Sequence, residues 1–275
     1  PIMGKQQSWD NAWDVRAMSN YNTITSLSES EVQEGLLWAG TDDGIIQYTT
    51  DSGANWTKIP VTKLGLPSRA FVNDIKADVF DKNTVYVSLD NHKEGDYKPY
   101  LLVSNDMGKT WRSLGKDLGE RNLVWRMVQD YVKKDLLFAA TENGIFTSLN
   151  GGQNWQKMSG TPTISFRDIT IQREENDLVA ASFGRGFFVL DNYAPLRDFT
   201  AENLSKKATL FAPRTAKWYV PRSNVGNTGA DYYFAENPTF GAEFTVHMKD
   251  DYKSLKAKRK AAEKKLGAND NVPFP

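Results

Sequence analysis

With 275 residues, the chain can hold one large domain, or one domain and part of another. Lysine plus arginine and aspartate plus glutamate number 34 each, so the formal net charge is zero and there is no basic excess of the kind that indicates nucleic-acid binding. No apolar run is long enough to span a membrane. The absence of cysteine excludes disulfide bonds and thiol chemistry.

Neither end of the chain looks like a natural terminus. The start, Pro1 to Lys5, has no signal-peptide pattern, and the chain stops abruptly at Pro275. We therefore expect a piece of a longer polypeptide, with any export signal upstream. Residues 1–22 form an N-terminal segment without clear periodicity, in which Trp9 and Trp13 stand among polar residues.

Short apolar runs then recur in a repeating order over residues 23–198. The first three repeats each contain four predicted strands, and the fourth contains three. We expect these strands at residues 24–27, 36–41, 45–49 and 56–59; 72–77, 84–89, 100–103 and 111–114; 124–128, 136–141, 145–148 and 155–158; and 166–171, 178–182 and 187–190. Units of roughly 40–55 residues with four short strands are typical of propeller blades.

An octapeptide pattern, Ser/Thr-x-Asp-x-Gly-x-x-Trp, lies between the third and fourth predicted strands of the first three repeats. Its Asp or Asn can accept bonds from the backbone N–H groups that follow, its Gly supplies a conformation that a Cβ would hinder, and its Trp is expected to place a ring in the core. This Asp-box predicts architecture, because such a turn stabilises a blade and does not catalyse. The three copies contain Asp51, Gly53 and Trp56; Asp106, Gly108 and Trp111; and Asn150, Gly152 and Trp155.

The fourth repeat has no Asp-box, and its missing strand is expected to come from residues 1–22 or from beyond residue 193. Residues 199–275 are predicted to hold a linker, strands at 232–234 and 242–248 of a partial β-sandwich-like domain, and a charged helix at 250–266. The predicted fold is all-β. It has four four-stranded propeller blades with Asp-box turns, followed by the start of a second β domain with a helix.

Together with the Asp-boxes, the stretch from Gly184 to Asp191, followed by Pro195 to Arg197, resembles the end of the propeller in a group of large bacterial proteins. These are the BNR-repeat, sortilin-like propellers commonly labelled glycosyl hydrolases. The resemblance implies a secreted, periplasmic or cell-surface protein, in which the chain supplies the last propeller blades and the remainder of the larger propeller is their partner. One fold hosts both catalysis and binding, so the activity stays open.

In Asp-box enzymes the site lies on the face opposite the Asp-box turns, where the second and third strands of each repeat join. Glycoside hydrolysis needs two carboxyl groups facing one sugar bond, although Asp-Gly and Asn-Gly are also ordinary residues of tight turns. The catalytic candidates on this face are Asp42, Asp43, Asp90 and Glu142. The candidates for ligand binding are His92, Tyr97, Arg185, Trp9 and Trp13.

Structural motifs outnumber catalytic ones in this sequence, which favours a binding or scaffold module that engages a protein or glycan ligand. The alternative is a glycoside hydrolase acting on a polysaccharide. Two histidines and no cysteine argue against a zinc site, and no cofactor is indicated. Calcium held by aspartate and backbone oxygens stays open.

Overall fold

The computed structural model describes residues 23–68, 70–216, 218–220 and 240–266. The segment with Trp9 and Trp13 and the strand expected at 232–234 lie outside the described residues. The chain divides into two compact units, Pro1–Arg197 and Asp198–Pro275. All the repeated sheets belong to the first unit.

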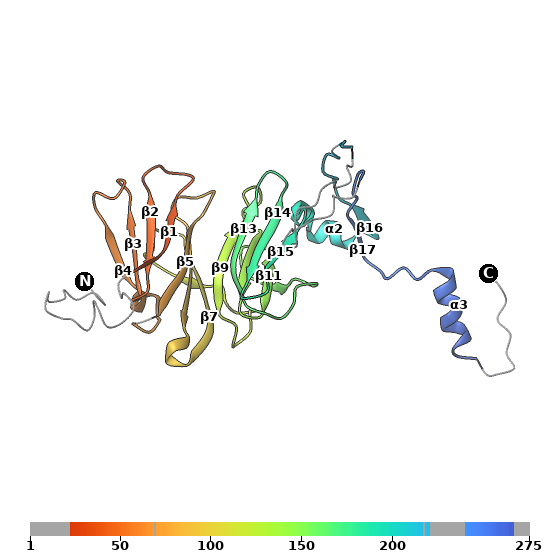
Figure 1. The fold of residues 1–275 in the computed structure, drawn as a ribbon, viewed down its shortest axis with the longest axis horizontal. Helices are drawn as coiled ribbons and strands as arrows, with labels where there is room; N and C mark the ends of the chain where they lie inside the picture. Colours follow the sequence, from red (N-terminus) through yellow and green to blue (C-terminus); the bar gives the residue numbers. More distant parts are fainter. Residues whose placement is uncertain (1–22, 69, 217, 221–239, 267–275) are drawn as a thin grey trace, which may run out of the picture. The chain divides into compact units, whose positions relative to one another are not determined.

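Four consecutive antiparallel sheets, here called blades 1 to 4, make up the first unit (Figure 1). Blade 1 contains β1 (Ile24–Glu29), β2 (Leu37–Thr41), β3 (Ile45–Thr49) and β4 (Thr57–Pro60). Blade 2 contains β5 (Phe71–Ala77), β6 (Val85–Asn91), β7 (Asp96–Ser104) and β8 (Arg112–Ser113). Blade 3 contains β9 (Val124–Gln129), β10 (Leu137–Thr141), β11 (Gly144–Ser148) and β12 (Gln156–Lys157). Blade 4 contains β13 (Phe166–Gln172), β14 (Asp177–Ser182) and β15 (Phe187–Leu190).

The structure confirms the predicted mostly-β fold of four-stranded antiparallel sheets. Blade 4 departs from four strands, because no described segment beyond residue 193 pairs with its sheet. The other source suggested for its missing strand, residues 1–22, is not described. Each sheet uses strands that follow one another in the chain, so each blade is a local unit of sequence.

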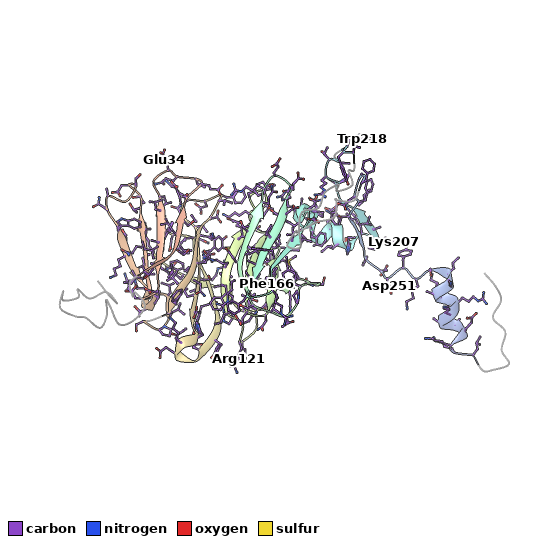
Figure 2. The ribbon with its side chains drawn as sticks, viewed as in Figure 1. Glu34, Arg121, Phe166, Lys207, Trp218 and Asp251 are labelled. Atoms are coloured by element: carbon purple, nitrogen blue, oxygen red, sulfur yellow. The ribbon has the colours of Figure 1, made fainter. Side chains whose placement is uncertain are left out.

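Apolar side chains fill the space between consecutive blades in three buried clusters. Trp38 belongs to the cluster between blades 1 and 2, Leu114 to the cluster between blades 2 and 3, and Phe166, labelled in Figure 2, to the cluster between blades 3 and 4. The second strands have nearly continuous apolar sequences because neighbouring blades cover both of their faces.

The first strands of the blades lie side by side: β1 beside β5, β5 beside β9, and β9 beside β13. Each is the edge strand of its own sheet, so the amides on its free side need partners from elsewhere. Side chains of a neighbouring blade supply them. Ser26 Oγ accepts a hydrogen bond from the Ile75 amide at 2.9 Å, and Asp74 Oδ2 accepts one from the Met127 amide at 3.2 Å.

The Asp-box turns follow the predicted hydrogen-bond logic. In blade 2, Asp106 Oδ1 accepts from the Thr110 amide and from Ser104 Oγ, both at 2.8 Å. Asp51 in blade 1 and Asn150 in blade 3 make the equivalent contacts. One short polar side chain therefore closes each turn between the third and fourth strands.

The three Asp-box tryptophans differ in burial, so the expectation that each ring enters the core is wrong for one of them. Trp155 is 7% exposed, and its indole Nε1 donates to the Leu114 carbonyl of blade 2 at 2.8 Å. Trp111 is partly buried against the cluster between blades 1 and 2. Trp56 is 43% exposed. An Asp-box tryptophan packs against the preceding blade, and no described blade precedes blade 1.

The Asp-box glycines show the same difference. Gly108 has a φ of 77°, and a Cβ placed there would lie 2.4 Å from Ile59 Cδ1 of the preceding blade. A Cβ on Gly53 would meet only Trp56 of its own turn, at 3.8 Å. The Asp-box glycine therefore allows both a left-handed turn and close packing between blades.

The unfolding free energy is expected to fall between about pH 4 and pH 2 as the two Asp-box carboxylates take up protons. Hydrogen bonds from Thr110 lower the pKa of Asp106 to about 2, and bonds from Thr49 and Asn55 lower the pKa of Asp51 to about 2. Because these values lie below the unfolded value of about 3.9, the contribution is complete above that pH and is lost as the pH falls toward 2. Urea unfolding across this range should give a flatter pH dependence for the Asp51→Asn, Asp106→Asn variant than for wild type. Identical slopes would contradict the assignment.

The connection from Asp90 to Pro99, which holds the candidates His92 and Tyr97, is mostly strand. β6 extends to Asn91, the short 3₁₀ turn η2 covers His92–Glu94, and β7 begins at Asp96. Asn91 pairs with Asp96 across the two strands. The additional residues therefore lengthen the β6–β7 hairpin rather than forming an irregular loop.

A buried carboxylate ties blade 3 to the segment that follows blade 4, which includes the 3₁₀ helix η3 (Ala194–Asp198). Asp130 is fully buried and accepts hydrogen bonds from Tyr193 Oη at 2.6 Å, Arg197 Nη2 at 2.7 Å and the Lys133 amide at 2.6 Å. These bonds lower the pKa of Asp130 against the opposing effect of burial. The Pro-Leu-Arg sequence at 195–197 thus has a structural role.

The second unit contains α2 (Ala201–Ser205), β16 (Ala208–Leu210), β17 (Val246–Met248) and α3 (Leu255–Glu263). β16 pairs with β17 in an antiparallel sheet of two strands. The strand expected at 242–248 and the helix expected at 250–266 are both shorter than predicted. Ser254 sets the start of α3, because its Oγ accepts from the Ala257 amide at 3.2 Å. A remaining 3₁₀ helix, η1 (Val61–Leu64), follows blade 1.

Candidate functional site

A β-bulge occurs at the same point in the first strand of every blade. The pairing with the second strand skips one residue in each case: Thr25 in blade 1, Asn73 in blade 2, Trp125 in blade 3 and Arg167 in blade 4. A bulge leaves one residue unpaired, bends the strand and redirects a side chain, and bulges are common beside functional sites. The four bulged residues therefore mark a shared feature that is independent of the Asp-boxes.

All four bulged residues line one cavity of about 470 Å³. It lies at the end of the sheets where the second and third strands join, opposite the Asp-box turns. The other residues that line it are Phe71, Asp90, His92, Lys93 and Arg126. Consecutive blades thus contribute to a single concave site, which is the ordinary form of a binding site.

Two of the bulged residues also fasten neighbouring blades together. Thr25 Oγ1 donates to the Val72 carbonyl of blade 2 at 2.6 Å, and Asn73 Nδ2 donates to the Val124 carbonyl of blade 3 at 3.0 Å. In both cases the acceptor precedes the next bulged residue. These bonds fix the side of the cavity formed by blades 1 to 3.

The other two bulged residues stack on each other. The Arg167 guanidinium lies 3.6 Å from the centroid of the Trp125 ring, and Arg167 Nε donates to Ser165 Oγ at 3.0 Å. Glu142 Oε2 accepts from Trp125 Nε1 at 2.9 Å and from Ser165 Oγ at 2.8 Å. This arrangement holds the guanidinium plane in one orientation at the cavity.

The β6–β7 hairpin supplies further lining residues of the cavity, and the His92 ring lies 6.1 Å from the Trp125 ring between centroids. His92 Nδ1 contacts the carboxylate of Asp90, which is 2% exposed, and the His92 amide donates to the same oxygen at 3.2 Å. Lys93 Nζ lies 5.4 Å from the centroid of the Phe71 ring. The longer hairpin of blade 2 thus brings one buried carboxylate, one imidazole and one ammonium group to the site.

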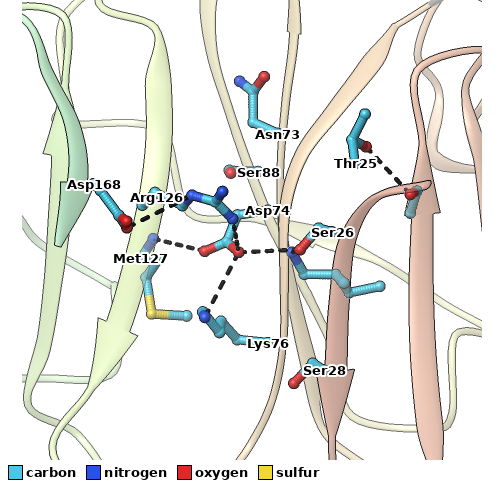
Figure 3. Close-up of polar contacts among 12 residues, drawn as sticks. Thr25, Ser26, Ser28, Asn73, Asp74, Lys76, Ser88, Arg126, Met127 and Asp168 are labelled. Atoms are coloured by element: carbon cyan, nitrogen blue, oxygen red, sulfur yellow. Dashed lines mark hydrogen bonds and ion pairs between the residues drawn. The ribbon is translucent and has the colours of Figure 1, made fainter. Parts of the chain in front are cut away.

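A row of polar side chains crosses the four blades beside the cavity (Figure 3). Asp74 Oδ1 accepts from Ser26 Oγ of blade 1 at 3.2 Å and from Arg126 Nη1 of blade 3 at 2.8 Å. Arg126 Nε lies 3.7 Å from Asp168 Oδ1 of blade 4, and Lys76 Nζ lies 3.8 Å from Asp74. Burial raises the pKa of Asp74, although the charges of Lys76 and Arg126 oppose the shift. Arg126, which lines the cavity, is thus held by carboxylates on both sides.

The structure brings some of the predicted site residues together and leaves others apart. Asp90 and His92 line the cavity, and Glu142 contacts the bulged Trp125. Asp42 accepts from the Thr23 amide at 2.9 Å in a turn of blade 1 and does not line the cavity.

Three further candidates, Asp43, Arg185 and Tyr97, stand outside this cavity. Asp43 is 3% exposed and accepts from Thr41 Oγ1 at 2.5 Å, as a turn residue does. Arg185 is exposed in the β14–β15 hairpin. Tyr97 lies 5.0 Å from the Arg121 guanidinium and lines a different cavity, of about 770 Å³. Trp9 and Trp13 are outside the described residues.

Sequence reasoning missed most of the cavity lining. Trp125, which the sequence placed only within the strand expected at 124–128, is 9% exposed and lines the cavity. The residues that the sequence did not single out are Thr25, Phe71, Asn73, Lys93, Arg126 and Arg167. Their residue types share no pattern, and the bulge that aligns them leaves no mark in the sequence.

In the described part of the chain, no group of three or more His, Asp or Glu side chains is arranged to hold a metal ion. None of the helices described there is long and apolar enough to cross a membrane.

The chain matches no protein-family model, and no curated protein matches its sequence. Solved structures do match its fold. The extracellular domain of the one-component system BT4673 from B. thetaiotaomicron has a TM-score of 0.49 and 15% identity, over 64% of this chain and 22% of that one. The GH74 xyloglucanase of Xanthomonas campestris has a TM-score of 0.47 and 10% identity, over 58% and 26%. Ycf48 bound to D1 peptide has a TM-score of 0.46 and 18% identity, over 61% and 51%.

The sheets of the first unit have the strand arrangement of β-propeller blades. The chain spans between about a fifth and about half of the length of these solved structures.

Proposed function

We propose that this chain is the ligand-binding part of an exported or cell-surface, multi-domain bacterial protein, and that the cavity at the four bulges is its binding site. The observation that most directly supports this proposal is that four equivalent bulged residues, one from each blade, line one cavity. Bulges redirect side chains at some cost in strand pairing, so their repetition around a single site is well explained by ligand recognition. The ligand is a glycan or a protein segment.

Export is part of the same proposal and rests on the sequence resemblance to exported bacterial propellers. The lack of cysteine accords with it. The rest of the larger propeller would provide the blades that flank blades 1 and 4, whose outer sides expose Trp56 and Phe187 in the structure.

Glycoside hydrolysis is the second candidate function, and one observation favours it. Asp90 lines the cavity. Glu142 accepts hydrogen bonds from Trp125, which also lines the cavity, and from Ser165. The two carboxylates have different surroundings, as an acid and a base require. However, Asp90 is buried against His92 and Glu142 is engaged by two donors, so both side chains also have structural partners.

The binding proposal predicts that Arg167→Ala abolishes capture of ligands that the wild-type chain binds. Arrays of immobilised glycans and peptides would be probed with the full chain, with Arg167→Ala and with Arg112→Ala, a matched control on the exposed outer strand β8 of blade 2. Signals that survive in the control and disappear in Arg167→Ala place the ligand at the cavity. Signals that are equal in all three proteins would contradict the proposal.

The hydrolase alternative has its own measurement. Reducing-sugar release from a panel of polysaccharides would be compared for wild type and Asp90→Asn. If wild type releases reducing sugar and Asp90→Asn does not, while the variant still folds and still binds on the arrays, the chain is a glycoside hydrolase rather than a binding module.

A further inference from the structure

We infer that the ligand at this cavity is an acidic sugar, namely a uronic acid residue of a glycan, whose carboxylate is bound by Arg167 and Lys93. The inference rests on the proposed function, since it names the ligand class of the same site. It is carried by the charges of the cavity lining, by the fixed position of Arg167 and by the polar side chains among the remaining lining residues.

Positive side chains prevail in the lining. Lys93, Arg126 and Arg167 are cationic, whereas Asp90 is the one carboxylate among the described residues that line the cavity. The Asp90 carboxylate is in contact with His92. Arg126 is bound to buried Asp74 and lies near Asp168, so its charge is already balanced within the row beside the cavity. Arg167 has only the 4.0 Å contact of its Nη2 with Glu142 Oε2, and no ion pair of Lys93 is found among the described residues, so these two charges are the least compensated in the lining.

Arg167 is prepared for a planar anion. Its side chain is 43% exposed, its plane is stacked on Trp125, and its Nε is bound to Ser165 Oγ. Its Nη2 is 4.0 Å from Glu142 Oε2, which is beyond hydrogen-bonding distance. The outer N–H groups of a guanidinium that is held in this way can bind a carboxylate with both oxygens, at little further loss of side-chain entropy.

The rest of the wall combines polar groups with apolar surface. Asn73, Asp90 and His92 present polar groups to the cavity. The two aromatic rings of the lining, Trp125 and Phe71, are each covered by a cation, Arg167 and Lys93 respectively. A sugar offers hydroxyls to these donors and acceptors and a C–H face to the apolar part of the lining. We therefore take the ligand to be a glycan, and an acidic peptide is an outcome of the test.

The test is isothermal titration calorimetry, which would measure the dissociation constant of the full chain for uronate oligosaccharides from polygalacturonate, alginate and glucuronan. Each would be compared with its carboxyl-reduced counterpart, which keeps the hydroxyls and loses the charge, and with oligoglutamate. We expect at least one uronate to bind, and its reduced form to bind about tenfold more weakly or worse, because charge-assisted hydrogen bonds are lost. Arg167→Gln and Lys93→Met should weaken uronate binding by a similar factor, and the control Arg112→Gln should not. Added salt should weaken binding to wild type more than to the Arg167→Gln variant.

Different failures have different meanings. If a uronate and its reduced form bind equally, or only reduced forms bind, and Arg167→Gln abolishes that binding, the cavity is a binding site but the acidic-sugar inference is wrong. If oligoglutamate binds and no uronate does, the ligand is an acidic peptide and the inference is again wrong. If nothing binds in a way that depends on Arg167 or Lys93, in these titrations or on the arrays, both the inference and the proposed function fail. Circular dichroism of each variant would confirm that it is folded.

Discussion

Replacing Trp155 by alanine is expected to lower the unfolding free energy by about 3–5 kcal/mol, the usual loss for a large aromatic ring removed from a core. Trp155 is 7% exposed and belongs to the cluster between blades 2 and 3. Its indole also donates to the Leu114 carbonyl, so truncation would leave both a cavity and an acceptor without its donor. Denaturant unfolding followed by far-ultraviolet circular dichroism would measure the change.

The other two Asp-box tryptophans provide the matched controls within the same chain. Replacing Trp56, which is 43% exposed, by alanine should lower the unfolding free energy by less than about 1 kcal/mol. Replacing the partly buried Trp111 by alanine should give a loss between those of Trp56→Ala and Trp155→Ala. If the three substitutions had equal effects, the motif itself and not the preceding blade would determine the contribution of the ring.

Asp130→Ala is expected to be as damaging, at about 3–5 kcal/mol, because it leaves the Arg197 guanidinium without its buried partner. Asp130 is fully buried and Arg197 is 17% exposed in its side chain. The loss also removes the acceptor for Tyr193 Oη and for the Lys133 amide. Unfolding in urea near neutral pH would measure the change, since the lowered pKa of Asp130 makes its contribution complete there and lost only as the pH falls below the unfolded value of about 3.9.

The double variant Asp130→Ala, Arg197→Met, compared with the two single variants, would measure the contribution of the Asp130–Arg197 ion pair apart from the other contacts of Asp130. Removing both charges should cost less than the sum of the two single changes, because no unpaired buried charge remains. If the two losses of unfolding free energy were strictly additive, Asp130 would stabilise the fold through the Lys133 amide and Tyr193 Oη rather than through Arg197.

The blades could be predicted from the sequence because their determinants are local. The Asp-box fixes a turn with residues four apart, and the same turn occurs around Asp51, Asp106 and Asn150. The tryptophan after the turn was only half predictable. Its burial depends on the preceding blade, which the octapeptide does not encode, and Trp56 is therefore exposed.

The site could not be predicted in the same way, because it depends on how the blades are registered against one another. A bulge at Thr25, Asn73, Trp125 and Arg167 is a matter of strand pairing, and the four residues differ in size, charge and polarity. Asp90 and His92 were found because they follow the second predicted strand of their repeat, at the end where the second and third strands join. Arg167 was not, because no short-range pattern distinguishes it from any other arginine in a strand.

The side chains that bind edge amides also have a consequence for association with other chains. An unpaired strand edge is a template on which a foreign strand can add, by domain swapping or by growth of a cross-β fibre. Ser26 and Asp74 occupy the amides of Ile75 and Met127, which such a strand would need. Blades 1 and 2 thereby each deny the first strand of the following blade to an intruding chain, through polar side-chain atoms.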